Sequence, residues 1–202
     1  MRTVALARIR NAAPIVAAAV AVLFPLGLAL RARPVAAAGA FTLTSPAFKN
    51  NGMIPDKYSF NQMNCTGENQ SPPLAWTNPP AGTKSFALMV HDPDAPTGSG
   101  WWHWVVYDIA ADATTLAEGA GKEGGTSLPK GATMGHTDFG TAAYGGPCPP
   151  PGSGKHHYHF TLFALKVDKL EVPHTASAAM IGFNVNANSL GKATLTGLFA
   201  RK

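Results

Sequence analysis

Glycine and proline recur so often along this chain that few stretches can form a long helix. The 202 residues include 21 glycines and 17 prolines, and turn-forming clusters at residues 49–52 and 78–82 separate short apolar segments. Proline fixes φ and removes a backbone donor, and glycine is unfavourable in a helix interior. We therefore expect a domain rich in strands and loops rather than a bundle of helices.

Short segments rich in β-branched and aromatic residues mark the expected strands. They lie at residues 41–48, 58–63, 85–92, 101–109, 157–167 and 193–199. The best helical candidate lies within residues 176–190, although glycine and asparagine weaken it. Short strands joined by long loops predict a mainly β fold, an antiparallel sandwich or barrel with one or two minor helices.

The N-terminus has the pattern of an export signal. Three arginines in the first ten residues precede an uncharged apolar stretch at residues 12–30, and small residues around Ala38 and Ala40 fit a cleavage site. We predict a signal peptide at residues 1–40, cleaved after Ala38 or Ala40, and one domain at residues 41–202 of a periplasmic or secreted protein. No stable membrane span is expected after removal of the signal. The apolar stretch is nearly long enough for a retained membrane anchor, and that alternative stays open.

The net charge of +5 comes from this leader. Five of the 16 basic residues lie in the first 33 positions and all 11 acidic residues come later, so the remaining sequence carries equal numbers of each sign. A nucleic-acid-binding protein needs a basic patch, so no nucleic acid is expected as a partner. Cys65 and Cys148 are permitted to pair in an exported protein, but their sequence separation leaves the geometry of a disulfide open.

An acidic residue, Asp92, ends one of the short apolar segments. Because side chains alternate along a strand, Leu88, Val90 and Asp92 are expected on one face. Asp92 then either forms a turn or belongs to a site, and the prolines that follow it make the loop rigid. The peptide bond between Ala95 and Pro96 is a candidate for the cis form.

A histidine, His103, stands among three tryptophans in residues 101–109. Alternation places His103, Val105 and Tyr107 on one face and the two adjacent tryptophans on the other. Large aromatic side chains exclude water, and a partly dry imidazole needs a partner. We expect Asp92 to be that partner and to favour the charged imidazolium.

A proline-rich loop leads into the segment that carries the next histidines. Between Pro147 and Pro151 the one residue with a backbone N–H is Cys148, and this donor is available to an anion. If the strand has begun by His156, then His156 and Tyr158 share a face.

Together these residues predict a pocket for a small anion such as phosphate, sulfate or a carboxylate. The predicted ligand-binding residues are Asp92, His103, Cys148, Pro150, His156 and Tyr158. Imidazole, phenol and amide groups supply the donors, and prolines and aromatic rings supply the walls.

Other kinds of site are less favoured by the sequence. No cofactor and no metal are expected, because no HExxH or similarly tight ligand spacing occurs. No catalytic residue is assigned and the protein is not expected to be an enzyme, because the sequence lacks a Gly-x-Ser-x-Gly elbow. A hydrolase with His103 or His156 as general base, or a set of histidines that merely pack, are the alternatives.

These segments together resemble the phosphatidylethanolamine-binding protein (Raf kinase inhibitor-like) family. The resemblance lies in Asp92–Pro96, Trp102–Trp104, and Gly146–Pro150 followed by His156-His157-Tyr158, where the family usually has arginine at the position of His157. Residues 67–76 and 188–193 are similar to the bacterial YbhB/YbcL branch. The resemblance covers residues 41–202.

The resemblance implies an antiparallel β-sandwich with Greek-key-like connections and short helices near the C-terminus. It implies a pocket for phosphate-like groups, including phospholipid head groups, at the six residues named above. It also implies cis peptide bonds before Pro96 and Pro150. Some relatives inhibit kinases or proteases, so a protein target outside the cytoplasm is an alternative partner.

Overall fold

The computed structural model describes residues 39–201, so most of the predicted signal peptide lies outside the described residues. The elements are β1 (Thr42–Thr44), β2 (Gly52–Met53), the 3-10 helix η1 (Asp56–Tyr58), β3 (Leu74–Thr77), β4 (Ser85–Asp92), β5 (Trp101–Ala110), β6 (Thr115–Leu116), β7 (Thr133–Met134), β8 (Lys155–Leu165), α1 (Ala178–Asn188) and β9 (Ser189–Ala200). No helix in this part of the chain is long and apolar enough to cross a bilayer.

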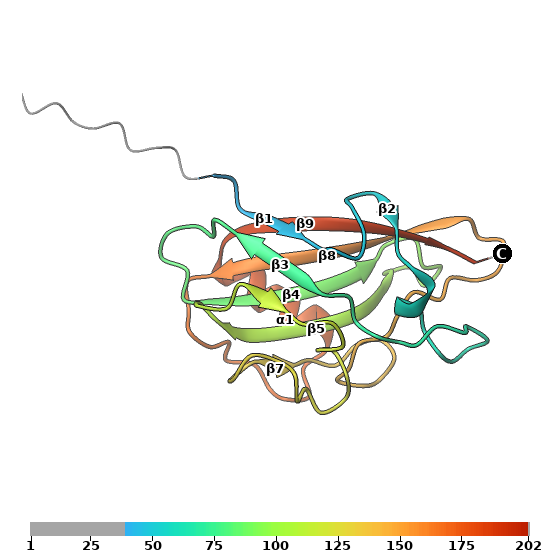
Figure 1. The fold of residues 1–202 in the computed structure, drawn as a ribbon. Coiled ribbons are helices and arrows are strands. Elements are labelled where there is room, and N and C mark those ends of the chain that lie inside the picture. Colours follow the sequence, from blue (N-terminus) through green and yellow to red (C-terminus); the bar gives the residue numbers. More distant parts are fainter. Residues whose placement is uncertain (1–38, 202) are drawn as a thin grey trace, which may run out of the picture. The chain divides into compact units, whose positions relative to one another are not determined.

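Two sheets form the body of the domain. The smaller has the order β1-β3-β6, and the larger has the order β2-β9-β8-β4-β5-β7. The long strands β9, β8, β4 and β5 run side by side with β3 in front of them (Figure 1). All pairings are antiparallel except that of β2 with β9. The connection from β5 to β8 passes over to the other side of β4, which is the Greek-key-like order that we expected.

The two faces of the large sheet bury different cores. Leu88 and Val90 of β4 pack toward the small sheet together with Trp76 of β3. Met89 of β4 packs on the opposite face together with Ile181 of α1. The alternation predicted for β4 is therefore confirmed, and Asp92 continues the face that looks toward the small sheet.

Helix α1 covers the second face of the large sheet (Figure 1). It begins at an N-cap, Ser177, whose hydroxyl accepts a hydrogen bond from the Met180 N–H. Its residues Ala178, Ile181 and Val185 are buried against the sheet. The predicted helix is thus confirmed, and packing of this face compensates for the weak helix propensity of its glycine and asparagines.

The strand predicted at residues 58–63 is wrong. The segment instead leaves η1 through a tight turn in which the Cys65 N–H donates to the Gln62 carbonyl, and Met63 and Asn64 have positive φ of 54° and 59°. Left-handed backbone cannot continue a strand ladder.

Truncation of Ile181 should destabilise the domain strongly, because its side chain is 1% exposed in the core beneath α1. We expect Ile181→Ala to lower the free energy of unfolding by about 2–5 kcal/mol. Met180→Ala on the same helix is the matched control, since Met180 is 49% exposed and its truncation should change stability by less than about 0.5 kcal/mol. Urea unfolding measures both. Equal losses would show that α1 does not pack through Ile181.

Candidate functional site

All six residues predicted to bind a ligand line one cavity of about 160 Å³. Asp92 lies at the end of β4, His103 on β5, and His156 and Tyr158 on β8. Cys148 and Pro150 come from the loop that precedes β8. The sequence analysis missed the other lining residues, which are Met63, Ala95, Pro96, Thr97, Trp101, Phe139 and Pro149.

A β-bulge turns His103 into this cavity. Val90 of β4 pairs with Trp104, whereas the next residue, His91, pairs with Trp102, so one extra residue of β5 lies between the two pairs. The extra residue breaks the alternation and puts His103 on the same side as Trp104. Our prediction that His103 shares a face with Val105 and Tyr107 is therefore wrong, because those two residues face α1.

The partner of His103 is a backbone carbonyl rather than Asp92. Its Nδ1 lies 2.7 Å from the carbonyl oxygen of Gly145, and the Gly145 N–H donates to the His103 carbonyl at 2.8 Å. Because a carbonyl oxygen can only accept, Nδ1 carries the hydrogen. Burial lowers the pKa of His103 to about 4, against the raising effects of Gly145 and of the nearby Asp92 charge. The expected imidazolium at His103 is thus wrong, and the ring is neutral.

Asp92 pairs instead with His156. The distance from His156 Nδ1 to Asp92 Oδ2 is 2.7 Å, and both side chains are almost completely buried. The second carboxylate oxygen, Oδ1, accepts the Asp94 N–H at 2.9 Å. The carboxylate thus orients an imidazole, as predicted, but the imidazole is the one on β8.

A serine completes a chain of hydrogen bonds with this pair. Ser153 Oγ lies 3.0 Å from His156 Nε2 and 2.7 Å from the Pro150 carbonyl oxygen. The Pro150 carbonyl also accepts the Ser153 N–H at 3.2 Å. The serine hydroxyl has one hydrogen, so it donates either to this carbonyl or to His156 Nε2, and the other group is its second partner.

Two further donors of the cavity have no acceptor. The Tyr158 hydroxyl and the Trp101 indole N–H are buried and have no hydrogen-bond partner among the described residues. Burial raises the pKa of Tyr158, and the charge of the neighbouring Asp92 carboxylate raises it further, so the hydroxyl keeps its hydrogen. Asp92 lies near enough for a long, weak interaction with this hydroxyl, but no Tyr158–Asp92 contact is as short as a hydrogen bond. The indole N–H groups of Trp76 and Trp104 also have no partner within residues 39–201, but they lie in the core and do not line the cavity. Because Tyr158 and Trp101 do line it, a ligand in the cavity is in a position to supply their acceptor.

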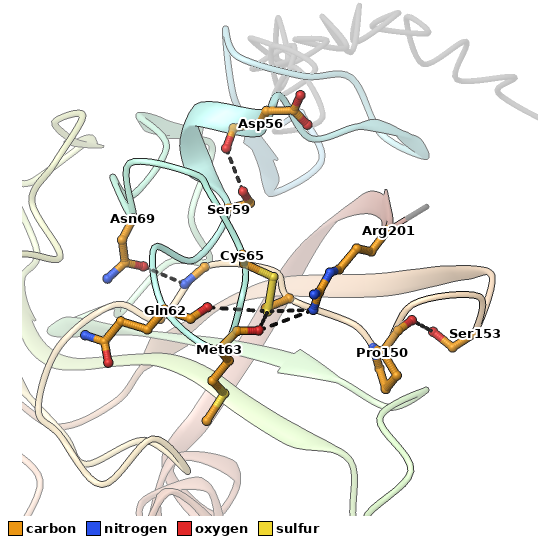
Figure 2. Close-up of a disulfide and its surroundings, with 12 residues drawn as sticks. Asp56, Ser59, Gln62, Met63, Cys65, Asn69, Pro150, Ser153 and Arg201 are labelled. Atoms are coloured by element: carbon orange, nitrogen blue, oxygen red, sulfur yellow. Dashed lines mark hydrogen bonds between the residues drawn. A yellow bond between two sulfur atoms is a disulfide. The ribbon is translucent and has the colours of Figure 1, made fainter.

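A disulfide joins Cys65 to Cys148, which lines the cavity (Figure 2 shows the disulfide and its surroundings). It joins residues 83 apart in sequence, with Cα atoms 6.0 Å apart. It anchors the turn that carries Met63, whose carbonyl lies 3.4 Å from Arg201 Nη1. Within residues 39–201 the Cys148 N–H has no protein acceptor, so this predicted donor remains available to a ligand.

The peptide bonds before Pro96 and Pro150 were expected to be cis, and this is wrong. No cis peptide bond occurs in the described part of the chain. The loop after Asp92 is stabilised by the Asp94 N–H, which donates to the Asp92 carboxylate, and the turn after Pro150 by the Ser153 N–H, which donates to the Pro150 carbonyl at 3.2 Å.

The rim and walls complete the site. His157 occupies the position at which the family described above usually has arginine. Its side chain contacts Asp94, with 2.7 Å between His157 Nδ1 and Asp94 Oδ2. The Phe139 ring packs edge-on against His103 and Trp101, with ring centroids 5.3 Å and 5.5 Å apart. Among residues 39–201 no three His, Cys, Asp or Glu side chains converge in a way that could hold a metal ion.

Comparison with known proteins gives consistent matches over the whole described domain. A model of the family described as phosphatidylethanolamine-binding protein matches residues 44–200. The UPF0098 proteins YbcL and YbhB of Escherichia coli are 47% and 46% identical, over 83% and 78% of this chain and 91% and 99% of their own lengths. A Mycobacterium tuberculosis protein named "Putative lipoprotein LppC" is 39% identical over 82% of this chain and 75% of its own.

Solved structures agree with these matches. The crystal structure of Escherichia coli YbcL, described as a new member of the mammalian PEBP family, has a TM-score of 0.78 and 46% identity. The alignment covers 80% of this chain and 99% of that one. A PEBP homologue from Chlamydia trachomatis has a TM-score of 0.67 and 32% identity, over 81% of this chain and 99% of that one.

The neutral state of buried His103 should make stability depend on pH. The unfolded chain takes up a proton at this residue near its reference pKa of about 6.5, whereas the folded-state pKa is about 4. Because the unfolded state binds more protons between these values, the free energy of unfolding should fall by up to about 3 kcal/mol as the pH falls from 7 to about 4.

Urea unfolding across this pH range, for the wild type and for His103→Asn, measures the contribution of His103. The asparagine amide can take the place of Nδ1 at Gly145 but does not titrate, so the variant should lose less stability toward low pH. Parallel curves for the two proteins would contradict a lowered pKa at His103.

Proposed function

The chain belongs to the phosphatidylethanolamine-binding protein family, and we propose that its cavity binds a small oxyanion such as phosphate or a phosphate-bearing head group. The observation that carries this proposal is the pair of buried donors without acceptors, Tyr158 O–H and Trp101 N–H. The free N–H of Cys148 adds a third donor on the wall of the same cavity. An oxyanion offers acceptors to all three.

The size of the cavity favours a small ligand. Its volume of about 160 Å³ equals that of roughly five liquid waters at about 30 Å³ each. Pockets for drug-sized ligands are larger, at about 300–1,000 Å³. The cavity therefore has room for a tetrahedral oxyanion with a short substituent, and a complete lipid would extend beyond it.

Neutral donors rather than fixed cations hold the ligand in this proposal. His103 is neutral, His156 is hydrogen-bonded to the Asp92 carboxylate, and no lysine or arginine among the described residues lines the cavity. Oriented neutral dipoles bind an anion well in a dry site, because they are already in place and the low dielectric strengthens each bond.

We also propose that the protein acts outside the cytoplasm. The export pattern of residues 1–40 supports this location, and the name of the mycobacterial relative, a lipoprotein, supports it weakly. The disulfide between Cys65 and Cys148 agrees with an oxidising compartment. A function in binding is favoured over hydrolysis, because the sequence has no Gly-x-Ser-x-Gly elbow.

Removal of the Tyr158 hydroxyl should weaken anion binding without loss of stability. In Tyr158→Phe we expect phosphate affinity to fall about tenfold to a hundredfold, as for the loss of one hydrogen bond to a charged group. The thermal stability without phosphate should stay the same or rise, because an unpaired buried donor has been removed.

Tyr107→Phe is the matched control, since Tyr107 is buried on the opposite face of the large sheet and should leave phosphate affinity unchanged. Calorimetric titration of both variants and the wild type at pH 6 provides the measurement. If the wild type does not respond to millimolar phosphate, the proposed function is wrong.

Cleavage of the leader is tested by expressing the full chain in a bacterial host and sequencing the N-terminus of the product. We expect a mature chain that starts at Gly39 or Phe41, recovered from the periplasm or the medium. A chain that lacks residues 1–40 should stay in the cytoplasm. Recovery of the uncleaved chain in the membrane fraction would instead support the retained anchor.

A further inference from the structure

The cavity offers acceptors to a ligand as well as donors. His103 Nδ1 donates to the Gly145 carbonyl at 2.7 Å, so in the neutral ring the second nitrogen, Nε2, carries a lone pair. No protein group among the described residues donates to Nε2. The lone pair is therefore what the imidazole offers to a molecule in the cavity.

The Asp92 carboxylate is a second acceptor. Each of its oxygens receives one hydrogen bond, Oδ2 from His156 and Oδ1 from the Asp94 N–H. A carboxylate accepts about four hydrogen bonds, so it retains capacity for a further donor. The neighbouring Tyr158 hydroxyl competes for this capacity, and a ligand donor gains it when Tyr158 donates to the ligand instead. A ligand oxygen with a full negative charge beside Asp92 or His103 Nε2 would meet a lone pair without a hydrogen between them, and this contact is repulsive.

We propose that the site selects oxyanions that carry a proton, such as the monoanions of phosphate and of phosphomonoesters, over oxyanions that carry none. This inference rests on the proposed function and narrows its ligand class. The ligand's P–OH group donates to His103 Nε2 or to Asp92, while its remaining oxygens accept from Tyr158, Trp101 and the Cys148 amide. Sulfate and phosphodiesters have no such proton near neutral pH, so both are rejected.

The surroundings of His103 keep the lone pair available. The titratable groups around it are Asp92 and His91 of β4 and His156 and Tyr158 of β8, and the aromatic edges of Tyr158 and Phe139 pack against its ring. Burial outweighs the attraction of the Asp92 charge, so the ring stays neutral above about pH 4. The acceptor therefore persists over the range in which phosphomonoesters lose their second proton, near pH 6.

A series of ligands tests the inference on the wild-type protein. We expect methyl phosphate and inorganic phosphate at pH 5.5 to bind at least about tenfold more tightly than sulfate or dimethyl phosphate. The latter two anions carry no proton, so their complexes would leave a buried acceptor of the protein unpaired. Dimethyl phosphate represents the diester of an intact phospholipid, and methyl phosphate represents a free head group. This comparison therefore also separates the two sources of a phosphate group.

The pH dependence distinguishes a proton on the ligand from a proton on the protein. Methylphosphonate loses its second proton at a higher pH than methyl phosphate does. If the ligand's proton is required, the pH at which affinity falls should move upward for methylphosphonate by the difference between the two ligand pKa values. A midpoint that is the same for both ligands would assign the proton to a protein group and overturn the inference.

His103→Asn removes the Nε2 acceptor and keeps a donor for Gly145. We expect the preference for methyl phosphate over sulfate to fall at least about fivefold in this variant, in line with the loss of one discriminating contact. A thermal melt establishes that the variant is folded. The ligand series on the wild-type protein tests the inference independently of this variant. Equal binding of phosphate and sulfate by the wild type would overturn the selectivity and leave the proposed function intact, whereas failure to bind any of these anions would overturn the proposed function itself.

Discussion

The hydrogen bond from His103 Nδ1 to the Gly145 carbonyl is the interaction on which the cavity depends. It joins the bulged strand β5 to the loop that leads into Cys148, and the return bond from the Gly145 N–H makes the connection a reciprocal pair. It also fixes the tautomer of the imidazole and hence the chemical character of the cavity wall. Gly145 has no side chain, which is required because a Cβ there would overlap the Phe139 ring.

His103 is neutral and no lysine or arginine of residues 39–201 lines the cavity, although the sequence suggested a cationic site. Two histidines beside a carboxylate predicted positive charge, but burial and specific partners distribute the protons differently. One imidazole is kept neutral by burial and donates to a carbonyl, and the other is hydrogen-bonded to Asp92. Recognition of an anion then depends on how well its oxygens and protons fit the fixed donors and lone pairs of the cavity. The positions of the ligand's hydrogen-bonding groups therefore matter more than its charge.

Local patterns predicted much of the fold. The four long strands β4, β5, β8 and β9 and the helix were expected because apolar, β-branched and aromatic residues cluster between glycine and proline turns, whereas β3 was missed. Alternation correctly placed Asp92 on β4 and His156 and Tyr158 on β8. The resemblance to a known family supplied the sandwich, and the six expected residues do meet in one cavity.

The remaining features depend on contacts between distant segments. The bulge at His103 arises from the register of β5 against β4, and the sequence of β5 alone has no signal for it. His156 meets Asp92 because β8 pairs with β4, and this pairing of distant segments is likewise absent from the local sequence. The disulfide joins loops 83 residues apart, and Phe139 reaches the cavity from a long loop. The local sequence gives no information on which distant segments these residues contact.

The protonation of His103 is the most direct test of this account. Nitrogen-15 NMR of the imidazole at pH 6.5, without ligand, distinguishes a protonated ring nitrogen from one that carries a lone pair. We predict that His103 has its hydrogen on Nδ1 and a lone pair on Nε2. A spectrum with hydrogen on both nitrogens, or on Nε2 alone, would contradict the account.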